Sequence, residues 1–182
     1  MSAKYSFNLR SSDRTRALPA KIIIGQNSTE TISHVMLKLL AYLLFYRERL
    51  QIEINLHIDS IQFVPDLVQL DYELRPALWV ECGDCGAAKL HKLAVKVPDA
   101  AIWVIKRSRA ELEVLVRSMQ KLDLRRNRYD LLALDSGMFD ELCGLARSRN
   151  EVFWVNGMFD PPQMQFDFNG LWFDNSFHIQ RF

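Results

Sequence analysis

The sequence predicts a mixed α/β (α+β) fold, in which helices flank a mixed central sheet. The spacing of apolar residues changes repeatedly between the period of a strand and that of a helix. The resulting elements follow the order strand, helix, three strands, helix, strand, helix and strand. In addition, 182 residues with 49% apolar content and only 7 Gly and 6 Pro suffice for one core. We therefore expect a single domain over residues 1–182.

Strands and a long helix are expected first. Residues 5–10 (YSFNLR) alternate in polarity, and residues 20–25 (AKIIIG) contain a β-branched run. Asn27 and Glu30 have the spacing of a capping box, which predicts the start of the helix. The charged residues 47–49 end it. Its apolar residues recur at helical spacing: Ile32, Val35, Met36, Leu39, Leu40 and Leu43.

Three strands and a second helix come next. Residues 50–56 (LQIEINL) alternate with a period of two, and residues 68–74 (VQLDYEL) do so in part. Residues 76–82 (PALWVEC) form a continuous apolar run, which is typical of strands buried on both faces. A glycine-containing turn leads into a helix that Pro98 ends. The apolar stripe of this helix consists of Leu90, Leu93, Ala94 and Val97.

The following elements alternate between strand and helix. Residues 101–106 (AIWVIK) predict a strand, and Ser108 is the expected N-cap of a helix over residues 110–120. Residues 128–134 predict another strand, and Ser136 is the expected cap of a last helix through residue 146.

The C-terminal segment differs from the rest of the chain in its aromatic content. The stretches FWVNG, QMQFDF and GLWFDNSF indicate a closing β-meander or edge strands. We therefore divide the domain into a core of about residues 20–135 and a β-rich extension of about residues 151–182. Most of the aromatic side chains are expected to pack in the core, and a surplus left exposed would mark a homodimer surface.

Charge and hydropathy restrict the classes of function. With 23 Lys and Arg against 22 Asp and Glu the net charge is +1, so no global field attracts nucleic acid or an anionic membrane. The longest apolar run, residues 35–46, contains Lys38 and is shorter than the roughly 20 residues that a membrane span requires. No apolar export signal follows the first Met, so we expect a cytoplasmic protein.

The cysteines permit three interpretations. Cys82 and Cys85 have the spacing of half a zinc site, but the chain offers only Cys143 and four scattered histidines for the other half. A redox pair would need the dipole of the following helix to lower the pKa of a thiol. The surrounding elements do not have the thioredoxin-like βαβ order in which such pairs occur. The interpretation we favour is that they are small, polarizable fillers beside a tight turn.

Two carboxylates predict a different site. If Asp66 lies at the start of one strand and Glu81 near the end of its antiparallel neighbour, both acids meet at one edge of the sheet. Metal-dependent phosphodiester hydrolysis needs converging carboxylates and a nearby cation, which Lys89 or Lys92 on the next helix would supply. Each residue also has a purely structural explanation: Asp66 as a turn residue, Glu81 as the partner of Lys89, and Glu30 as a helix cap.

The residues that carry a resemblance are the helix NSTETISHVMLKLLAYLLFYRERLQ, a proline–aspartate pair, LWVECG, a basic helix and AAIWVIKRSRAEL. This set is similar to the YaeQ family of the PD-(D/E)XK nuclease-like superfamily. The resemblance implies a restriction-endonuclease-like core of helix, three-stranded meander, helix and strand. It also implies catalytic roles for Glu30, Asp66 and Glu81, with Asp66 and Glu81 holding Mg²⁺ or Mn²⁺.

One position departs from that superfamily pattern. Gly83 stands where the motif has its lysine, and Lys92 or Lys89 from the following helix would replace it, with Lys92 the better fit to the basic helix. The resemblance thus implies a divalent-metal-dependent phosphodiesterase or nuclease acting on nucleic acid or another phosphodiester. The alternative is a catalytically inactive binding or scaffold protein of the same fold.

Overall fold

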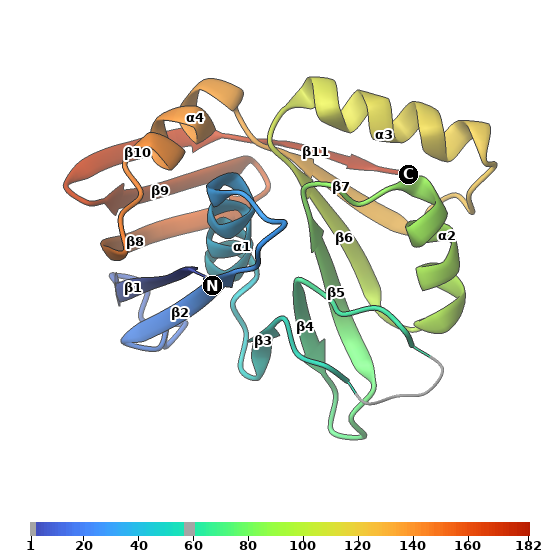
Figure 1. Cartoon of the computed structure of the whole chain (residues 1–182), viewed down its shortest axis with the longest axis horizontal. Coiled ribbons are helices and arrows are strands. Elements are labelled where there is room, and N and C mark those ends of the chain that lie inside the picture. Colours follow the sequence, from blue (N-terminus) through green and yellow to red (C-terminus); the bar gives the residue numbers. More distant parts are fainter. Residues whose placement is uncertain (1–2, 57–60) are drawn as a thin grey trace.

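Two β-sheets and four helices make up the part of the chain that the structure, a computed structural model, describes: residues 3–56 and 61–182. Helix α1 (Ile32–Phe45) lies between the sheets, as Figure 1 shows. The α+β class is therefore confirmed, but the single sheet that we expected is in fact two. Within the described residues no helix has the length and apolar character to cross a membrane.

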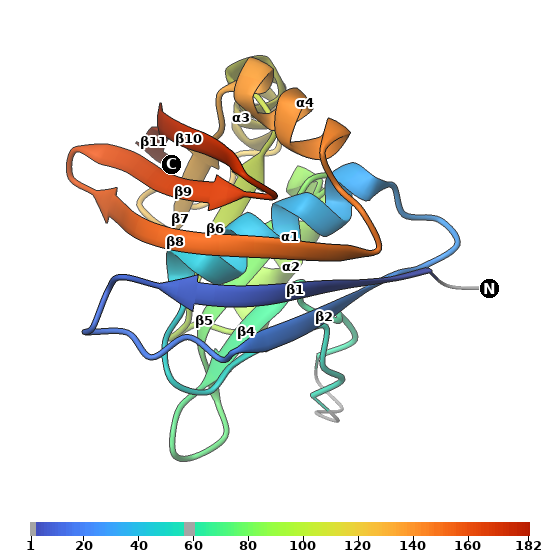
Figure 2. The ribbon, with the colours of Figure 1, turned by 90° about the vertical axis from the view of Figure 1, so that its left-hand side faces the viewer.

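The first sheet combines the two ends of the chain. The N-terminal hairpin β1–β2 pairs with the C-terminal meander β8–β10, because β1 runs parallel to β8 (Figure 2). Its order is β10 (Leu171–Ser176), β9 (Pro162–Phe168), β8 (Arg149–Phe159), β1 (Ala3–Ser11) and β2 (Lys21–Gln26). The predicted meander is confirmed, whereas its pairing with the N-terminal strands was not foreseen.

The second sheet contains the three-strand meander that the sequence predicts. Strands β3, β4 and β5 are antiparallel, β5, β6 and β7 are parallel, and β11 adds antiparallel to β7. Its order is β11 (His178–Arg181), β7 (Tyr129–Ala133), β6 (Ala101–Lys106), β5 (Pro76–Cys82), β4 (Leu67–Leu70) and β3 (Leu50–Ile52). Strands β5 and β6 coincide with their predicted ranges, while β3 and β4 are shorter than predicted.

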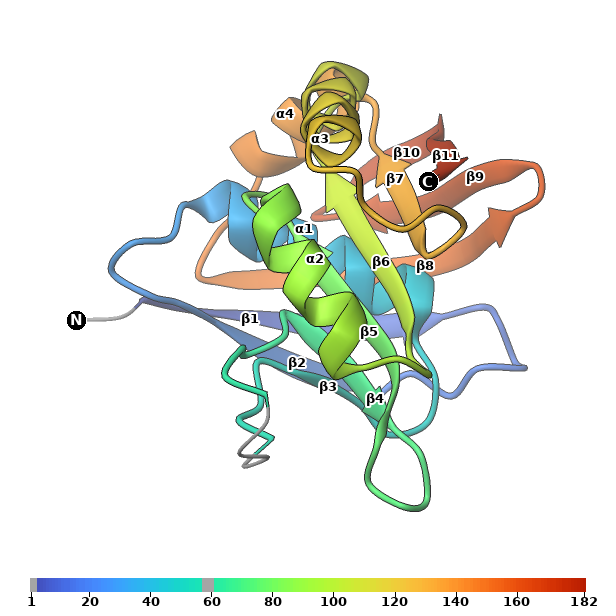
Figure 3. The same ribbon diagram turned by 90° about the vertical axis from the view of Figure 1, so that its right-hand side faces the viewer.

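The remaining helices cover different faces. Helices α2 (Ala87–Lys96) and α3 (Arg109–Lys121) lie on the outer face of the six-stranded sheet, which Figure 3 shows from that side. Helix α4 (Ser136–Gly144) packs with α1 on the inner face. Ser108 caps α3 as predicted, since its Oγ accepts a hydrogen bond from the Glu111 amide. The cap of α4 is Asp135 and not Ser136.

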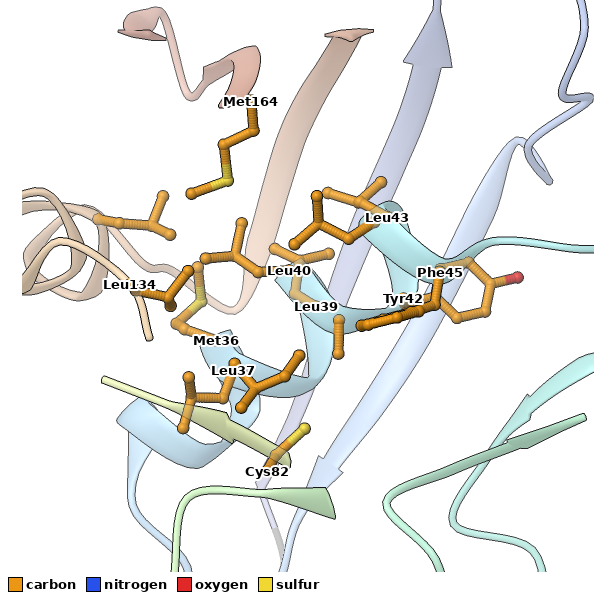
Figure 4. Packing of buried hydrophobic residues seen from close by; sticks show 14 of the residues in the cluster. Met36, Leu37, Leu39, Leu40, Tyr42, Leu43, Phe45, Cys82, Leu134 and Met164 are labelled. Carbon is orange, nitrogen blue, oxygen red and sulfur yellow. The ribbon is translucent and has the colours of Figure 1, made fainter. Parts of the chain in front are cut away.

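Helix α1 is buried on all sides from Val35 to Phe45 because both sheets and α4 contact it. Figure 4 shows Met36 and Leu40 of this helix among other buried side chains, which include Leu134 and Met164. The helix begins at Ile32 with Thr31 as its N-cap, four residues after the predicted N-cap Asn27. The reciprocal half of the predicted capping box does form, because the Asn27 amide donates to Glu30 Oε2 at 2.9 Å.

Most of the C-terminal aromatic side chains are buried, as we expected. They stack within the five-stranded sheet and against α1, as in the pair Phe166 and Phe173, whose ring centroids lie 5.0 Å apart. Phe153 and Trp172 are the exposed aromatics of this region among the described residues, with 36% and 51% of their surface accessible. A homodimer that uses them stays a prediction.

Candidate functional site

The predicted acids lie at the same edge of the six-stranded sheet. Leu67 of β4 pairs with Val80 of β5, so Asp66, which precedes β4, follows in register beside Glu81. Asp66 Oδ2 accepts a hydrogen bond from the Cys82 amide at 2.7 Å, which fixes its carboxylate at the carboxyl end of β5. The antiparallel register thus joins acids that are far apart in sequence.

The start of α1 brings two further groups to Asp66. His34 lies in the first turn of the helix, and Glu30 lies just before the helix, next to the N-cap residue Thr31. His34 Nε2 lies 2.9 Å from Asp66 Oδ1, and His34 Nδ1 lies 3.2 Å from Glu30 Oε1. One ligand atom from each of the three side chains lies within 4.8 Å of the others, and we call Glu30, His34 and Asp66 the EHD cluster. Such a group has donors suited to a divalent metal ion.

A small opening leads to the EHD cluster. Its cavity has a volume of about 60 Å³, enough for about two water molecules. Glu30, just before α1, and His34, in its first turn, line the cavity on one side, and Gly83, Asp84 and Arg107 line it from the carboxyl ends of β5 and β6. Arg107 brings a positive charge to this mouth, although Glu111 pairs with it.

Glu81 has partners of its own on the other face of the strand. Only 3% of its surface is exposed, and its carboxylate accepts from Trp79 Nε1 at 2.7 Å and from Lys89 Nζ at 2.7 Å. Trp79 and Glu81 are two residues apart in β5 and therefore face α2, which carries Lys89. Lys92 is exposed, and its side chain forms no hydrogen bond or ion pair with the residues that the structure describes. Lys89 is therefore the lysine that lies beside Glu81.

Burial and charge set the protonation of the Glu81–Lys89 pair. Burial raises the pKa of Glu81, with a further contribution from the charge of Asp66, although Lys89 and Trp79 lower it. Burial alone would lower the pKa of Lys89, but the charge and hydrogen bond of Glu81 outweigh it and raise that pKa. Lys89 therefore stays protonated at neutral pH.

A buried lysine forms an ion pair with one acid of the EHD cluster. Lys38 is fully buried in α1, and its Nζ lies 3.2 Å from Glu30 Oε1 and 2.7 Å from Glu53 Oε1. Burial alone would raise the pKa of Glu30, but the Asn27 amide and Lys38 outweigh it and lower that pKa. Glu30 is thus held ionised at the cluster.

His34 and Lys38 were not among the site residues predicted from the sequence. Two features could have indicated them: the four-residue spacing of Glu30 and His34 at a helix start, and a lysine within an otherwise apolar helix. The structure joins Asp66 to Glu30 and His34, whereas Glu81 forms the adjacent pair with Lys89.

The cysteines fit the interpretation as packing residues. Cys82 and Cys85 are free thiols that pack in different apolar clusters. Burial raises the pKa of Cys82 well above its usual range and that of Cys85 to about 12, so neither is a thiolate at neutral pH. Over residues 3–56 and 61–182, the EHD cluster is the only group of three or more potential metal ligands. His57 lies outside the described residues.

The chain is similar to one protein family and to solved structures of that family. The family model described as YaeQ protein matches residues 2–154. The crystal structure of the YaeQ protein from Xanthomonas axonopodis pv. citri superposes with a TM-score of 0.72 at 21% identity, covering 99% of this chain and 97% of that one. The YaeQ protein from Pseudomonas syringae gives a TM-score of 0.71 at 17% identity, with coverages of 99% and 94%. No curated protein matches. At these identities the solved structures show a common fold.

Proposed function

This chain belongs to the YaeQ family, and we propose that it is a divalent-metal-dependent phosphodiesterase of the PD-(D/E)XK nuclease-like superfamily. The observation that carries the proposal is the EHD cluster beside the Glu81–Lys89 pair at one sheet edge. The order α1, β3, β4, β5, α2 and β6 supports it, because it is the order of the superfamily core. Under this proposal Glu30, Asp66 and Glu81 are the acids that correspond to those of the superfamily motif.

The donors of the EHD cluster suit Mn²⁺ better than Mg²⁺. Mg²⁺ prefers oxygen ligands in strict octahedral geometry, whereas an imidazole nitrogen beside two carboxylates suits a first-row transition metal. Glu30, His34 and Asp66 would hold the ion. Once bound, a divalent ion lowers the pKa of a coordinated water molecule and so supplies the nucleophile for hydrolysis.

The protein's own groups have separate roles around the phosphodiester. Lys89 stays protonated and offers its ammonium to the negative charge that develops on the phosphoryl oxygens. Glu81 holds Lys89 in place through the 2.7 Å hydrogen bond. Lys89 from α2 thus replaces the motif lysine, whose position in the sequence is occupied by Gly83. Lys92, one turn further along α2, and Arg107 at the mouth would contact substrate phosphates.

The proposal is tested by titrating the purified protein with Mn²⁺ and by assaying cleavage of DNA, RNA and bis(p-nitrophenyl) phosphate with and without Mn²⁺. We expect saturable binding at one site and cleavage that chelation abolishes. Glu30→Gln is expected to weaken Mn²⁺ binding, whereas Asp71→Asn, which removes a half-buried turn carboxylate, is the matched control. Binding that is unchanged in Glu30→Gln would disprove the metal site. Binding without cleavage would favour the inactive binding protein.

The affinity for Mn²⁺ is expected to rise with pH. Burial and the charge of Lys38 favour a low pKa for His34, but Asp66 and Glu30 outweigh them and raise that pKa above 6.5. A metal ion requires the neutral ring, so each bound ion displaces a proton below this pKa. We expect the affinity to increase by about tenfold per pH unit until the pH exceeds the His34 pKa. Titrations at several pH values measure this slope, and His34→Asn should flatten it.

The metal-free protein should show the opposite trend. The pKa of His34 is higher in the folded state than in the unfolded chain, so the charged ring stabilises the fold. This contribution is complete below the unfolded pKa of about 6.5 and is lost as the pH rises through the folded pKa. Urea unfolding at matched pH values, with His34→Asn as the reference, isolates this contribution. An equal pH dependence in that variant would contradict the assignment.

A further inference from the structure

A second, larger cavity lies at the carboxyl ends of β6 and β7. Its volume is about 430 Å³, within the range of small-molecule sites. Three segments line it: residues 108–110, which lead from β6 into α3, residues 133–136, which lead from β7 into α4, and residues 176–178, which join β10 to β11. None of these residues belongs to the EHD cluster or to the Glu81–Lys89 pair.

The cavity lies where the helices that follow two neighbouring strands pack on opposite faces of the sheet. After β6 the chain enters α3, which packs on the outer face with Val104 and Leu131. After β7 it enters α4, which packs on the inner face with Ile105 and Leu132. Figure 1 shows the two helices leaving the upper ends of neighbouring parallel strands. In open α/β sheets, ligands bind in the crevice that such a change of side creates.

The wall of the cavity carries a cationic pair. A guanidinium nitrogen of Arg109 lies 3.0 Å from His178 Nδ1. Because a guanidinium only donates hydrogen bonds, Nδ1 is the acceptor and the proton of the neutral ring is on Nε2. The pair therefore presents the guanidinium charge and an imidazole N–H group. Asp135 is the acidic group of the wall, and its Oδ1 accepts from the Met138 amide of α4.

Further donors surround Arg109 and His178. Ser108 and Asp135 satisfy the amides of Glu111 and Met138 in the first turns of α3 and α4. Within the described residues no hydrogen bond engages the amides of the first two residues of either helix: Arg109, Ala110, Ser136 and Gly137. The hydroxyls of Ser136 and Ser176 also line the cavity. Leu134 and Phe177 give it an apolar side.

We infer that this cavity binds a small phosphomonoester. The phosphate group accepts hydrogen bonds from Arg109, His178 and the amides at the two helix starts, and its organic group lies against Leu134 and Phe177. An arginine suits this task because its planar group can donate two parallel hydrogen bonds to a phosphate. The site requires no metal ion, so the inference stands independently of the proposed hydrolytic function.

The test is a titration of the protein with inorganic phosphate and with phenyl phosphate in the presence of EDTA. Amide NMR signals of Ala110 and Gly137 report the site directly. We expect saturable shifts at these amides and tighter binding of phenyl phosphate, because the apolar wall adds to its affinity. Chelation prevents any phosphate bound through a metal ion from contributing to the signal.

Three variants complete the test. Arg109→Ala should weaken binding by about tenfold or more, the loss of one charged hydrogen-bonding partner. Ser136→Asp puts a negative charge on the wall, where the first turn of α4 tolerates an acid, and should abolish binding. Arg117→Ala, which removes the same charge from an exposed position of α3, should bind normally. Unsaturable shifts, or equal weakening in Arg117→Ala, would overturn the inference.

Discussion

Replacing Asp66 by asparagine is expected to lower the rate of metal-dependent cleavage by at least about a thousandfold. Asp66 belongs to the EHD cluster, in which its carboxylate contacts the His34 ring. The amide oxygen of asparagine can still accept from the Cys82 backbone, so the strand end is expected to keep its geometry. The loss therefore reflects the missing negative charge, and initial cleavage rates at saturating Mn²⁺ measure it.

The control for this experiment is Asp71→Asn. Asp66 precedes β4, whereas Asp71 lies in the turn after that strand and accepts hydrogen bonds from Arg75 and from backbone amides. This variant should cleave at close to the original rate. If Asp66→Asn retained more than about a tenth of the activity, or if both variants lost it equally, the EHD cluster would not be the catalytic metal site.

Replacing Lys38 by methionine is expected to reduce the free energy of unfolding by about 3 kcal/mol or more. Methionine fills a similar volume, but the carboxylates of Glu30 and Glu53 lose the cation that pairs with both of them. Breaking a buried ion pair from one side leaves uncompensated charge, which accounts for the size of the effect. Urea denaturation measured by circular dichroism gives the change.

Two comparisons identify the cause of that loss. Lys92→Met removes an exposed lysine from α2 and should change stability by no more than about 0.5 kcal/mol. Adding Glu30→Gln and Glu53→Gln to Lys38→Met should restore part of the lost stability, because it removes the unpaired charges as well. A triple variant that is less stable than Lys38→Met would show that packing, and not charge, is responsible.

Local patterns predicted the elements with strong periodicity. Strands β5 and β6 have their predicted bounds because continuous apolar runs between turn residues specify buried strands. The pairing of β1 with β8 could not be predicted in this way, since it joins Phe7 to Asn150 and no local pattern specifies so distant a partner. The expected strand over residues 50–56 stops at Ile52, where Glu53 adopts a positive φ and turns its side chain to Lys38.

Part of the candidate site was predictable, because local patterns indicated the strands that carry two of its acids. Asp66 and Glu81 come together through an antiparallel register, which follows from the meander of β4 and β5. His34 and Lys38 depend on how α1 is rotated between the two sheets, and an almost entirely apolar helix gives no face from which to predict that rotation. The choice between Lys89 and Lys92 likewise required the position of α2 on the sheet.

The parallel pairing of β1 with β8 also affects how the chain folds during its synthesis on the ribosome. Ser6 aligns with Arg149, so the first strand emerges long before its neighbour is synthesised. Until residues 149–176 have been synthesised, one side of α1 lacks the meander that covers it in the finished protein. Such long-range closure slows folding and leaves that side of the helix uncovered while the rest of the chain is being synthesised.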